Sequence, residues 1–286
     1  MGNAIYKPKG KAGEYARYAC NFYVGCSNDC DYCYCKRGLL GHAMGAPTPT
    51  LKKCFKDYRH AYEVFWKELE CNMDAIRQAG GLFFTFTSDP WLPETKKLTI
   101  EAVSYAIDNF IPCKILTKRA DFIDNLPNWW IGTNRRDCLA FGFTLTGCDE
   151  LERNASTNAE RIAAMKRLHE MGFKTFASIE PVISINMSGE MITRTLGCCD
   201  LYKIGLLSGH KSYYPEDVAH FVKNINDIVQ EYNFANCRDV KVYWKDSVLE
   251  FLKMDQAYRD IDTRFSWKFN LPHCVKADYD MFHLIH

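Results

Sequence analysis

Four cysteines lie within ten positions near the N-terminus, in the stretch GCSNDCDYCYCKRG at residues 25–38. Cys26, Cys30 and Cys33 have the spacing C-x3-C-x2-C, and Cys35 follows two residues later. This spacing lets one short loop wrap three thiolates around a compact inorganic cluster. Three ligands leave a fourth metal position open. Cys35 is interpreted as a nearby spare thiol, although it could in principle be the fourth ligand.

Two simpler metal sites fit this spacing less well. Structural zinc typically takes two separated Cys or Cys/His pairs, and no second pair is visible, because Cys198 and Cys199 are adjacent while Cys237 and Cys274 stand alone. A bacterial ferredoxin would use C-x2-C-x2-C-x3-C-P, which the chain lacks. The cluster of cysteines therefore indicates a site with three thiolate ligands.

The composition is that of a protein with a substantial core. The chain has 286 residues, of which 47% are hydrophobic, and a formal net charge of +1, so no overall field attracts it to nucleic acid or membrane. The first sixty residues hold ten Lys/Arg against four Asp/Glu; a solvated surface explains this surplus at least as well as a nucleic-acid groove.

The N-terminus lacks the apolar run of a signal peptide, and no membrane span is visible in the sequence. We therefore expect a cytoplasmic protein, in which cysteines bind metal or pack in the core rather than form disulfides.

Alternating strand and helix patterns must position the cysteine loop. Apolar runs predict strands, and apolar residues at helical spacing predict helices. The expected strands are 21–24, 82–87, 114–118, 139–146, 175–179, 201–208 and, as a possible seventh, 240–244; the expected helices are 62–76, 97–110, 158–171 and 218–232. This order predicts a parallel sheet covered by helices, either doubly wound or a barrel. The cysteine loop follows the first strand, at the end where such folds carry their sites.

The segment CSNDCDYC, with Tyr32 before its last cysteine, resembles the signature of the radical S-adenosylmethionine superfamily. The predicted β/α order is similar to that family over about residues 15–235. The resemblance implies an α/β fold, a partial (β/α)6 TIM-type barrel within residues 1–235, with a C-terminal extension at 236–286 packed on it. It also implies that Cys26, Cys30 and Cys33 hold a 4Fe-4S cluster whose open iron binds S-adenosylmethionine. One electron from an external reductant such as flavodoxin or ferredoxin would then yield a 5′-deoxyadenosyl radical that abstracts hydrogen from a substrate.

The stretch FTFTSDPWLPE at 84–94 resembles the corresponding segment of the spore photoproduct lyase branch. The resemblance implies that Ser88 and Asp89 bind the methionine part of the cofactor, and a carboxylate suits its ammonium group. Taken alone, Ser-Asp-Pro is also an ordinary turn. Lys118 looks like the lysine that neutralises the cofactor's carboxylate. Tyr32 and Thr144, or Thr146 in place of Thr144, complete the expected cofactor contacts of this part of the chain.

Glu180 lies between an apolar strand and a proline, where an unpaired carboxylate would be costly to bury. We expect it to bind cofactor or substrate, or to pair with a base such as Lys203. His210, after the sixth strand, is equally consistent with a ligand contact and with a surface histidine.

The resemblance to spore photoproduct lyase has a limit. That enzyme has a cysteine two residues before the Ser-Asp pair, which returns a hydrogen atom to the product radical, and Phe86 occupies this position here. Repair of thymine photoproducts by the same route is therefore not expected. Cys148 and Tyr34 are the candidate catalytic hydrogen donors, with a packed loop thiol as the alternative for Cys148.

Two functions follow from these observations. The first is a radical S-adenosylmethionine enzyme acting on an unidentified substrate; the branch and the basic first sixty residues suggest nucleic acid as a substrate to test. The second is a non-catalytic iron–sulfur or zinc-binding module, or an electron carrier. The polar residues expected at the strand ends disfavour the second, because an electron carrier does not need a polar pocket beside its cluster.

Overall fold

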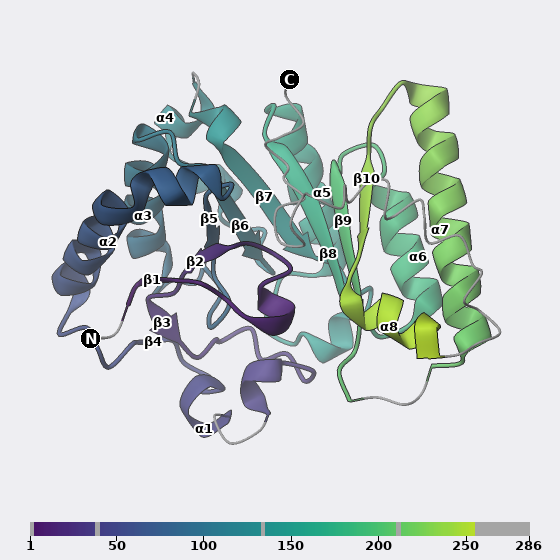
Figure 1. Cartoon of the computed structure of the whole chain (residues 1–286), viewed down its shortest axis with the longest axis horizontal. Coiled ribbons are helices and arrows are strands. Elements are labelled where there is room, and N and C mark those ends of the chain that lie inside the picture. The colour runs from purple at the N-terminus through teal and green to yellow at the C-terminus, as the bar shows by residue number, and fades with distance from the viewer. Residues whose placement is uncertain (1–2, 38–40, 133–134, 210–212, 255–286) are drawn as a thin grey trace.

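The chain folds around one large sheet in the computed structural model, which describes residues 3–37, 41–132, 135–209 and 213–254 (Figure 1). The sheet has eight strands in the order β1-β2-β5-β6-β7-β8-β9-β10. Their bounds are β1 Ile5–Tyr6, β2 Tyr18–Cys20, β5 Leu82–Phe84, β6 Cys113–Thr117, β7 Leu139–Thr144, β8 Lys174–Val182, β9 Leu201–Leu206 and β10 Lys241–Trp244. The neighbours from β2 to β10 are parallel, and β1 is an antiparallel edge strand. The strands at the two edges, β1 and β10, do not pair, so the sheet is open.

Most of the helices connect the parallel strands and cover the outer face of the sheet, whereas the short helix α1 lies away from that face, beside the cysteine loop (Figure 1). Their bounds are α1 Gly41–Met44, α2 Tyr58–Gln78, α3 Lys96–Asp108, α4 Asn128–Ile131, α5 Asn158–Glu170, α6 Ile185–Thr195, α7 Pro215–Asn236 and α8 Asp246–Met254. Local sequence fixes several helix starts: Asp57 caps α2, and Thr157 with Glu160 forms a capping box on α5, which satisfies otherwise unpaired N–H groups. The predicted α/β fold, a partial barrel of parallel strands, is confirmed.

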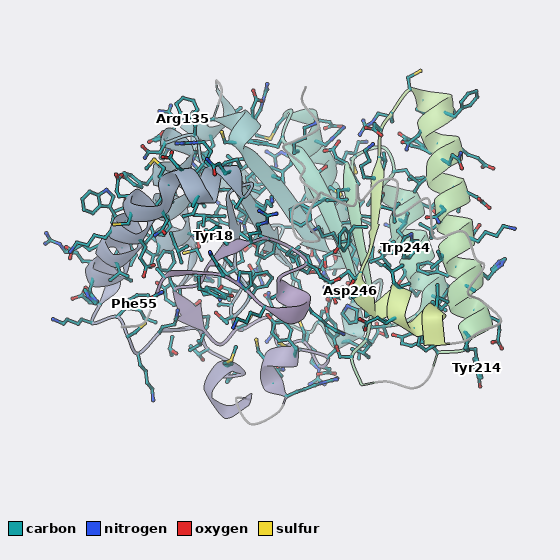
Figure 2. All side chains as sticks on the ribbon, viewed as in Figure 1. Tyr18, Phe55, Arg135, Tyr214, Trp244 and Asp246 are labelled. Carbon is teal, nitrogen blue, oxygen red and sulfur yellow. The ribbon has the colours of Figure 1, made fainter. Side chains whose placement is uncertain are left out.

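Packing between sheet and helices is dense. Every residue of β7 and β9 is buried, as expected for parallel strands covered by helices. At Gly142 in β7 an added Cβ would lie 2.1 Å from the ring of Phe176, so only glycine fits there. Trp244 of β10, labelled in Figure 2, packs edge-on against Phe221 of α7, with ring centroids 5.8 Å apart, and donates a hydrogen bond to Asn226. These contacts hold the strand ends in fixed positions.

The first strand differs from the prediction. The parallel strand β2 ends at Cys20, before the range 21–24. The Asn21 side chain accepts from the Phe86 N–H at 2.8 Å and donates to Tyr6, while its backbone N–H donates to the Ala4 carbonyl oxygen next to β1. Residues Tyr23–Val24 form a separate strand, β3, which pairs antiparallel with β4 (Thr50–Leu51). The cysteine loop therefore begins from a short two-stranded ribbon beside the sheet.

Two further elements bear on the prediction. Helix α6 between β8 and β9 was missed, although Ser184 caps it and Met191 and Ile192 are buried. The possible strand at 240–244 is confirmed as β10, which continues the parallel sheet next to β9. Residues 255–286 lie outside the described part of the chain, so the proposed division into 1–235 and 236–286 stays a prediction.

Candidate functional site

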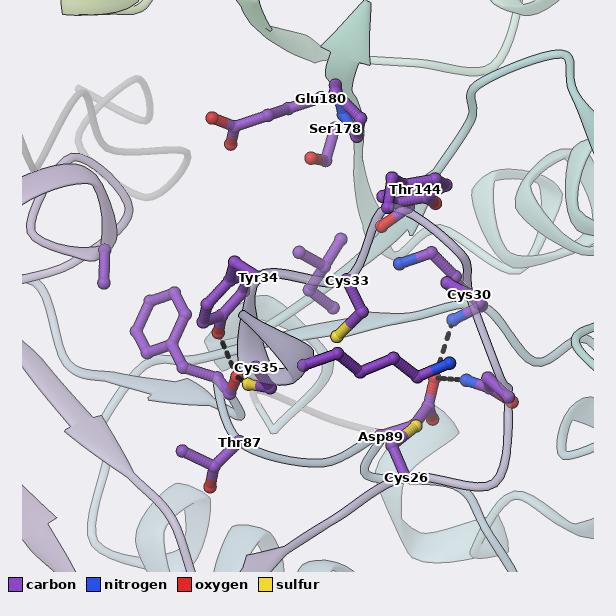
Figure 3. Close-up of a pocket in the computed structure, with 18 of the residues that line it drawn as sticks. Cys26, Cys30, Cys33, Tyr34, Cys35, Thr87, Asp89, Thr144, Ser178 and Glu180 are labelled. Carbon is purple, nitrogen blue, oxygen red and sulfur yellow. Dashed lines mark hydrogen bonds between the residues drawn. The ribbon is translucent and has the colours of Figure 1, made fainter. Parts of the chain in front are cut away.

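One cavity of about 450 Å³ opens at the C-terminal ends of the parallel strands. All four clustered cysteines, Cys26, Cys30, Cys33 and Cys35, line it. Figure 3 shows these cysteines on one side of the cavity and Ser178 and Glu180 on the opposite side. We call these two sides the cysteine side and the Glu180 side.

Backbone contacts hold the cysteine loop in place. Gly25 has φ +85°, and an added Cβ would lie 2.5 Å from a backbone carbonyl oxygen, so glycine is required where the loop begins. Cys26 donates its N–H to Ala46 at 2.9 Å, and Asp31 donates its N–H to Leu151 at 2.9 Å. Hydrogen bonds to two other segments thus hold the loop and position its thiols before any ligand binds.

The three thiols of the motif differ in their surroundings. Burial, aided by the charge of Asp89, raises the pKa of Cys26 to about 12, and burial also raises the pKa of Cys30. A hydrogen bond from Cys35, opposed by burial, lowers the pKa of Cys33 to about 6. No three His, Cys, Asp or Glu side chains of the described ranges are placed to hold a single metal ion. In an iron–sulfur cube each thiolate binds a different iron, so thiols spread along one loop fit a cluster better than a tetrahedral zinc site.

Asp89 is buried and joins three parts of the site. Its carboxylate accepts from Asn28 of the cysteine loop at 2.8 Å, from the Trp91 N–H at 3.0 Å, from the Thr117 hydroxyl at 2.7 Å and from the Lys118 N–H at 2.8 Å. Four donors fill the lone-pair positions of a carboxylate. The side chain predicted to bind the cofactor's ammonium group therefore already ties the cysteine loop to the end of β6.

Lys118 lines the cavity on the cysteine side. Its ammonium is 5.5 Å from the centre of the Tyr32 ring, and the Tyr32 hydroxyl donates to Glu152, which pairs with the buried Arg161. Burial lowers the pKa of Lys118, but the nearby Cys30 and Glu152 outweigh this, and the pKa lies above its usual value. A half-buried cation thus faces the cavity beside the thiols.

Two hydroxyl residues predicted for the cofactor also line the cavity. Ser88 Oγ is buried without a hydrogen-bond partner in the described part of the chain, and a buried unpaired hydroxyl is costly unless a ligand satisfies it. Thr144 lines the cavity at the end of β7. Thr146, the alternative to Thr144, does not line it and accepts a hydrogen bond from the Cys148 N–H instead.

The Glu180 side is built from three distant segments. Glu180 on β8 accepts from Lys245 Nζ, just after β10, at 2.6 Å and from the Tyr15 hydroxyl at 2.8 Å. Tyr15 also lies 2.7 Å from the Ser178 hydroxyl; since the single Tyr15 proton goes to Glu180, Ser178 donates to Tyr15. The expected pairing of Glu180 with Lys203 is wrong, because Lys203 donates to the Glu14 carbonyl oxygen at 2.7 Å. The expectation that Glu180 is paired with a base holds, with Lys245 as that base.

The predicted hydrogen donors separate in the structure. Tyr34 lines the cavity and donates to the Phe86 carbonyl oxygen. Cys148 is buried and is not among the residues that line the cavity. The thiol that does lie beside Phe86 is Cys35, whose Sγ is 3.8 Å from the same carbonyl oxygen. His210 lies outside the described residues.

Sequence reasoning missed Tyr15, Ser178 and Lys245, and it dismissed Cys35 as a spare thiol. Lys245 and Ser178 could have been found, because both lie at or near the end of a predicted parallel strand, where Ser88, Lys118 and Glu180 were sought. Tyr15 carried no such signal, because it precedes β2 on a segment without regular structure.

Comparison with known proteins gives a structural relationship and a weak sequence relationship. No protein-family model matches the chain. An uncharacterized protein of Methanocaldococcus jannaschii is 26% identical over 179 residues, covering 59% of this chain and 61% of that protein. A Cys-to-Ala mutant of spore photoproduct lyase superposes with a TM-score of 0.56 at 15% identity, covering 84% of this chain and 79% of that chain. The chain has the fold of spore photoproduct lyase.

A second solved structure shares this fold. Streptococcus suis SuiB bound to S-adenosylmethionine gives a TM-score of 0.50 at 12% identity, covering 79% of this chain but only 49% of that chain. The predicted resemblance to the radical S-adenosylmethionine superfamily, and to its spore photoproduct lyase branch, is confirmed at the level of the fold. None of the helices in the described ranges combines the length and apolar character that crossing a membrane requires.

Proposed function

We propose that this protein is a radical S-adenosylmethionine enzyme in which Cys26, Cys30 and Cys33 hold a 4Fe-4S cluster. The observation that carries the proposal is that these three thiols line one cavity together with the unpaired Ser88 hydroxyl and the Lys118 ammonium. When bound, the cluster supplies an electron that cleaves S-adenosylmethionine and generates a 5′-deoxyadenosyl radical. The fold shared with spore photoproduct lyase supports this class of chemistry.

The residues of the chain would divide the work of binding the cofactor. Lys118 offers a positive charge to a carboxylate, and Ser88 offers a hydroxyl that has no other described partner. Asp89 keeps the backbone of Lys118 and the cysteine loop in register, so we assign it a positioning role in place of the predicted contact with the cofactor's ammonium group, because its oxygens already accept four hydrogen bonds. Tyr32, Thr144 and Glu180 complete the proposed wall around the cofactor, and Tyr34 stays the proposed hydrogen donor to the substrate radical.

The proposal is tested by anaerobic reconstitution with iron and sulfide, followed by addition of dithionite and S-adenosylmethionine. We expect 5′-deoxyadenosine from the wild-type chain. Replacing Cys26, Cys30 and Cys33 with alanine together should abolish both bound iron and product, because the cluster loses its ligands. The matched control is Cys148→Ala, which removes a buried thiol outside the cavity and should keep its iron. A fully loaded wild-type cluster that yields no 5′-deoxyadenosine above background rejects the proposal.

One observation favours a second function. Cys35 places a fourth thiol on the cavity wall beside Cys33, and four thiolates suit a cluster that only carries electrons. Metal analysis and iron spectroscopy distinguish the two functions. A cluster with four cysteine ligands, or zinc without sulfide, would favour the carrier or a zinc module; a cluster whose spectrum changes when S-adenosylmethionine is added favours the enzyme.

A further inference from the structure

Positive charge collects on the rim of the cavity near the end of β9. Lys9 and Lys11 come from the N-terminal segment and Lys36 follows the cysteine loop; all three line the cavity and are exposed. Asp29 neutralises Lys36 at 2.6 Å. No ion pair joins Lys9, Lys11 or the neighbouring Arg37 to a carboxylate within the described ranges. The rim thus has an excess of positive charge, although the whole chain is nearly neutral.

Ser208, just after β9, fixes two of these cations at one place. Lys11 Nζ donates to the Ser208 hydroxyl at 2.7 Å, and Arg37 Nη1 donates to the Ser208 carbonyl oxygen at 3.2 Å. Both acceptors are uncharged, so they position the cations without neutralising them. Two segments that are far apart in the sequence therefore bring like charges to the same uncharged residue, an arrangement that an anion would stabilise.

The proposed cofactor does not need these cations. Lys118, beside Cys30, already provides a positive charge for a carboxylate on the cysteine side. The sulfonium group of S-adenosylmethionine is itself a cation and gains nothing from a positive rim. The rim charges are therefore available to another molecule that enters the cavity.

We propose that Lys9, Lys11 and Arg37 form a phosphate-binding rim that holds a phosphate group of the substrate. A guanidinium presents paired donors that match phosphate oxygens, and lysines add charge without strict geometry. The phosphate can belong to a small phosphorylated molecule or to the backbone of a nucleic acid. The inference rests on the proposed function, because it treats the cavity as the place where substrate meets cofactor.

The test measures binding by the cluster-loaded chain of 286 residues under anaerobic conditions. The probes are a short oligothymidylate, thymidine monophosphate and, as its uncharged counterpart, thymidine. The rim variant carries Lys9→Gln, Lys11→Gln and Arg37→Gln. The control variant carries Lys67→Gln, Lys166→Gln and Lys223→Gln, three exposed residues on the outer helices α2, α5 and α7. Both variants lose three positive charges, so a difference in probe binding between them is caused by the position of those charges.

The salt dependence gives the expected size of the effect. Three phosphate contacts on a single strand predict that the oligothymidylate binds about 20-fold more weakly at about 200 mM than at about 50 mM salt. The wild-type and control chains should show this loss, and the rim variant should bind weakly at both salt concentrations. Thymidine monophosphate could bind the wild-type chain more tightly than the rim variant while the oligothymidylate and thymidine bind both chains equally. In that case the substrate is a small phosphorylated molecule.

Equal binding of every probe by the wild-type chain and the rim variant would overturn the proposal. An acidic peptide such as hexaglutamate that binds as tightly as the oligothymidylate would also overturn it, in favour of a carboxylate-bearing partner. The two proposals fail separately. A wild-type chain that forms 5′-deoxyadenosine but ignores phosphate refutes the rim alone, whereas one that binds phosphate but forms no 5′-deoxyadenosine refutes the enzyme alone.

Discussion

At the scale of single residues, Asp89 organises the cysteine side of the cavity. Its two oxygens accept four hydrogen bonds from donors on three segments. In Asp89→Asn an amide NH2 replaces one oxygen and faces donors, so two hydrogen bonds to a charged acceptor are lost. We expect the free energy of unfolding, measured in urea, to fall by about 3 kcal/mol or more, together with less iron bound per chain.

Asp227→Asn is the matched control, because Asp227 is exposed on α7. Its free energy of unfolding should stay within about 0.5 kcal/mol of wild type. If Asp89→Asn were equally mild, the four hydrogen bonds would not hold the site together.

At the scale of elements, the C-terminal end of helix α5 is joined to the loop before β10 through His169. Arg238 Nη1 lies 3.1 Å from His169 Nε2, which fits a neutral imidazole that accepts from the guanidinium. Burial lowers the pKa of His169. The charge of Asp200 raises this pKa and the charge of Arg238 lowers it, and the pKa stays below its usual value. The unfolded chain, with an ordinary histidine pKa of about 6.5, therefore binds more protons than the folded chain just below that pH. Stability should fall as the pH drops below about 6.5.

The variant His169→Gln can still accept from Arg238 but does not titrate. We expect its free energy of unfolding to decline less than that of wild type between neutral and mildly acidic pH, in urea titrations at a series of pH values. His220→Gln, at an exposed position on α7, should keep the wild-type slope. An unchanged slope in His169→Gln would show that other groups cause the pH dependence.

At the scale of the whole molecule, Lys245 links the beginning and the end of the described chain across the sheet. Its buried ammonium lies 2.6 Å from Glu180 on β8 and 3.4 Å from Glu14 on the N-terminal segment. In Lys245→Met both carboxylates lose their cationic partner. In the described part of the chain, only the hydrogen bonds from the Tyr15 hydroxyl to Glu180 and from the Asp246 N–H to Glu14 remain. We expect the free energy of unfolding to fall by about 3 to 5 kcal/mol, the typical cost of breaking a buried ion pair, as measured in urea.

Two further variants make this prediction specific. Lys223→Met changes an exposed lysine of α7 in the same way and should have little effect. Adding Glu14→Gln to Lys245→Met should recover part of the lost free energy of unfolding, because the substitution removes one of the two unpaired carboxylates. Burial already disfavours the charge on Glu14, since it raises the pKa of that carboxyl group. Independent, additive effects of the two substitutions would contradict the coupling.

The sequence by itself determined what depends on local order. The apolar runs identified the parallel strands from β5 to β10, and the spacing of Cys26, Cys30 and Cys33 identified the site, because each pattern is complete within one short segment. The true end of β2 was less accessible, because the Asn21 side chain is held by tertiary contacts with Tyr6 and Phe86.

Tertiary structure alone decided which distant side chains meet. Glu180 pairs with Lys245 rather than Lys203, Asp89 binds Lys118 and Asn28 through hydrogen bonds, and Lys11 and Arg37 converge on Ser208. Each of these contacts joins residues that are far apart in the chain. Strand order, register and the path of the N-terminal segment across the open sheet fix them, and no pattern within a single segment encodes those three features.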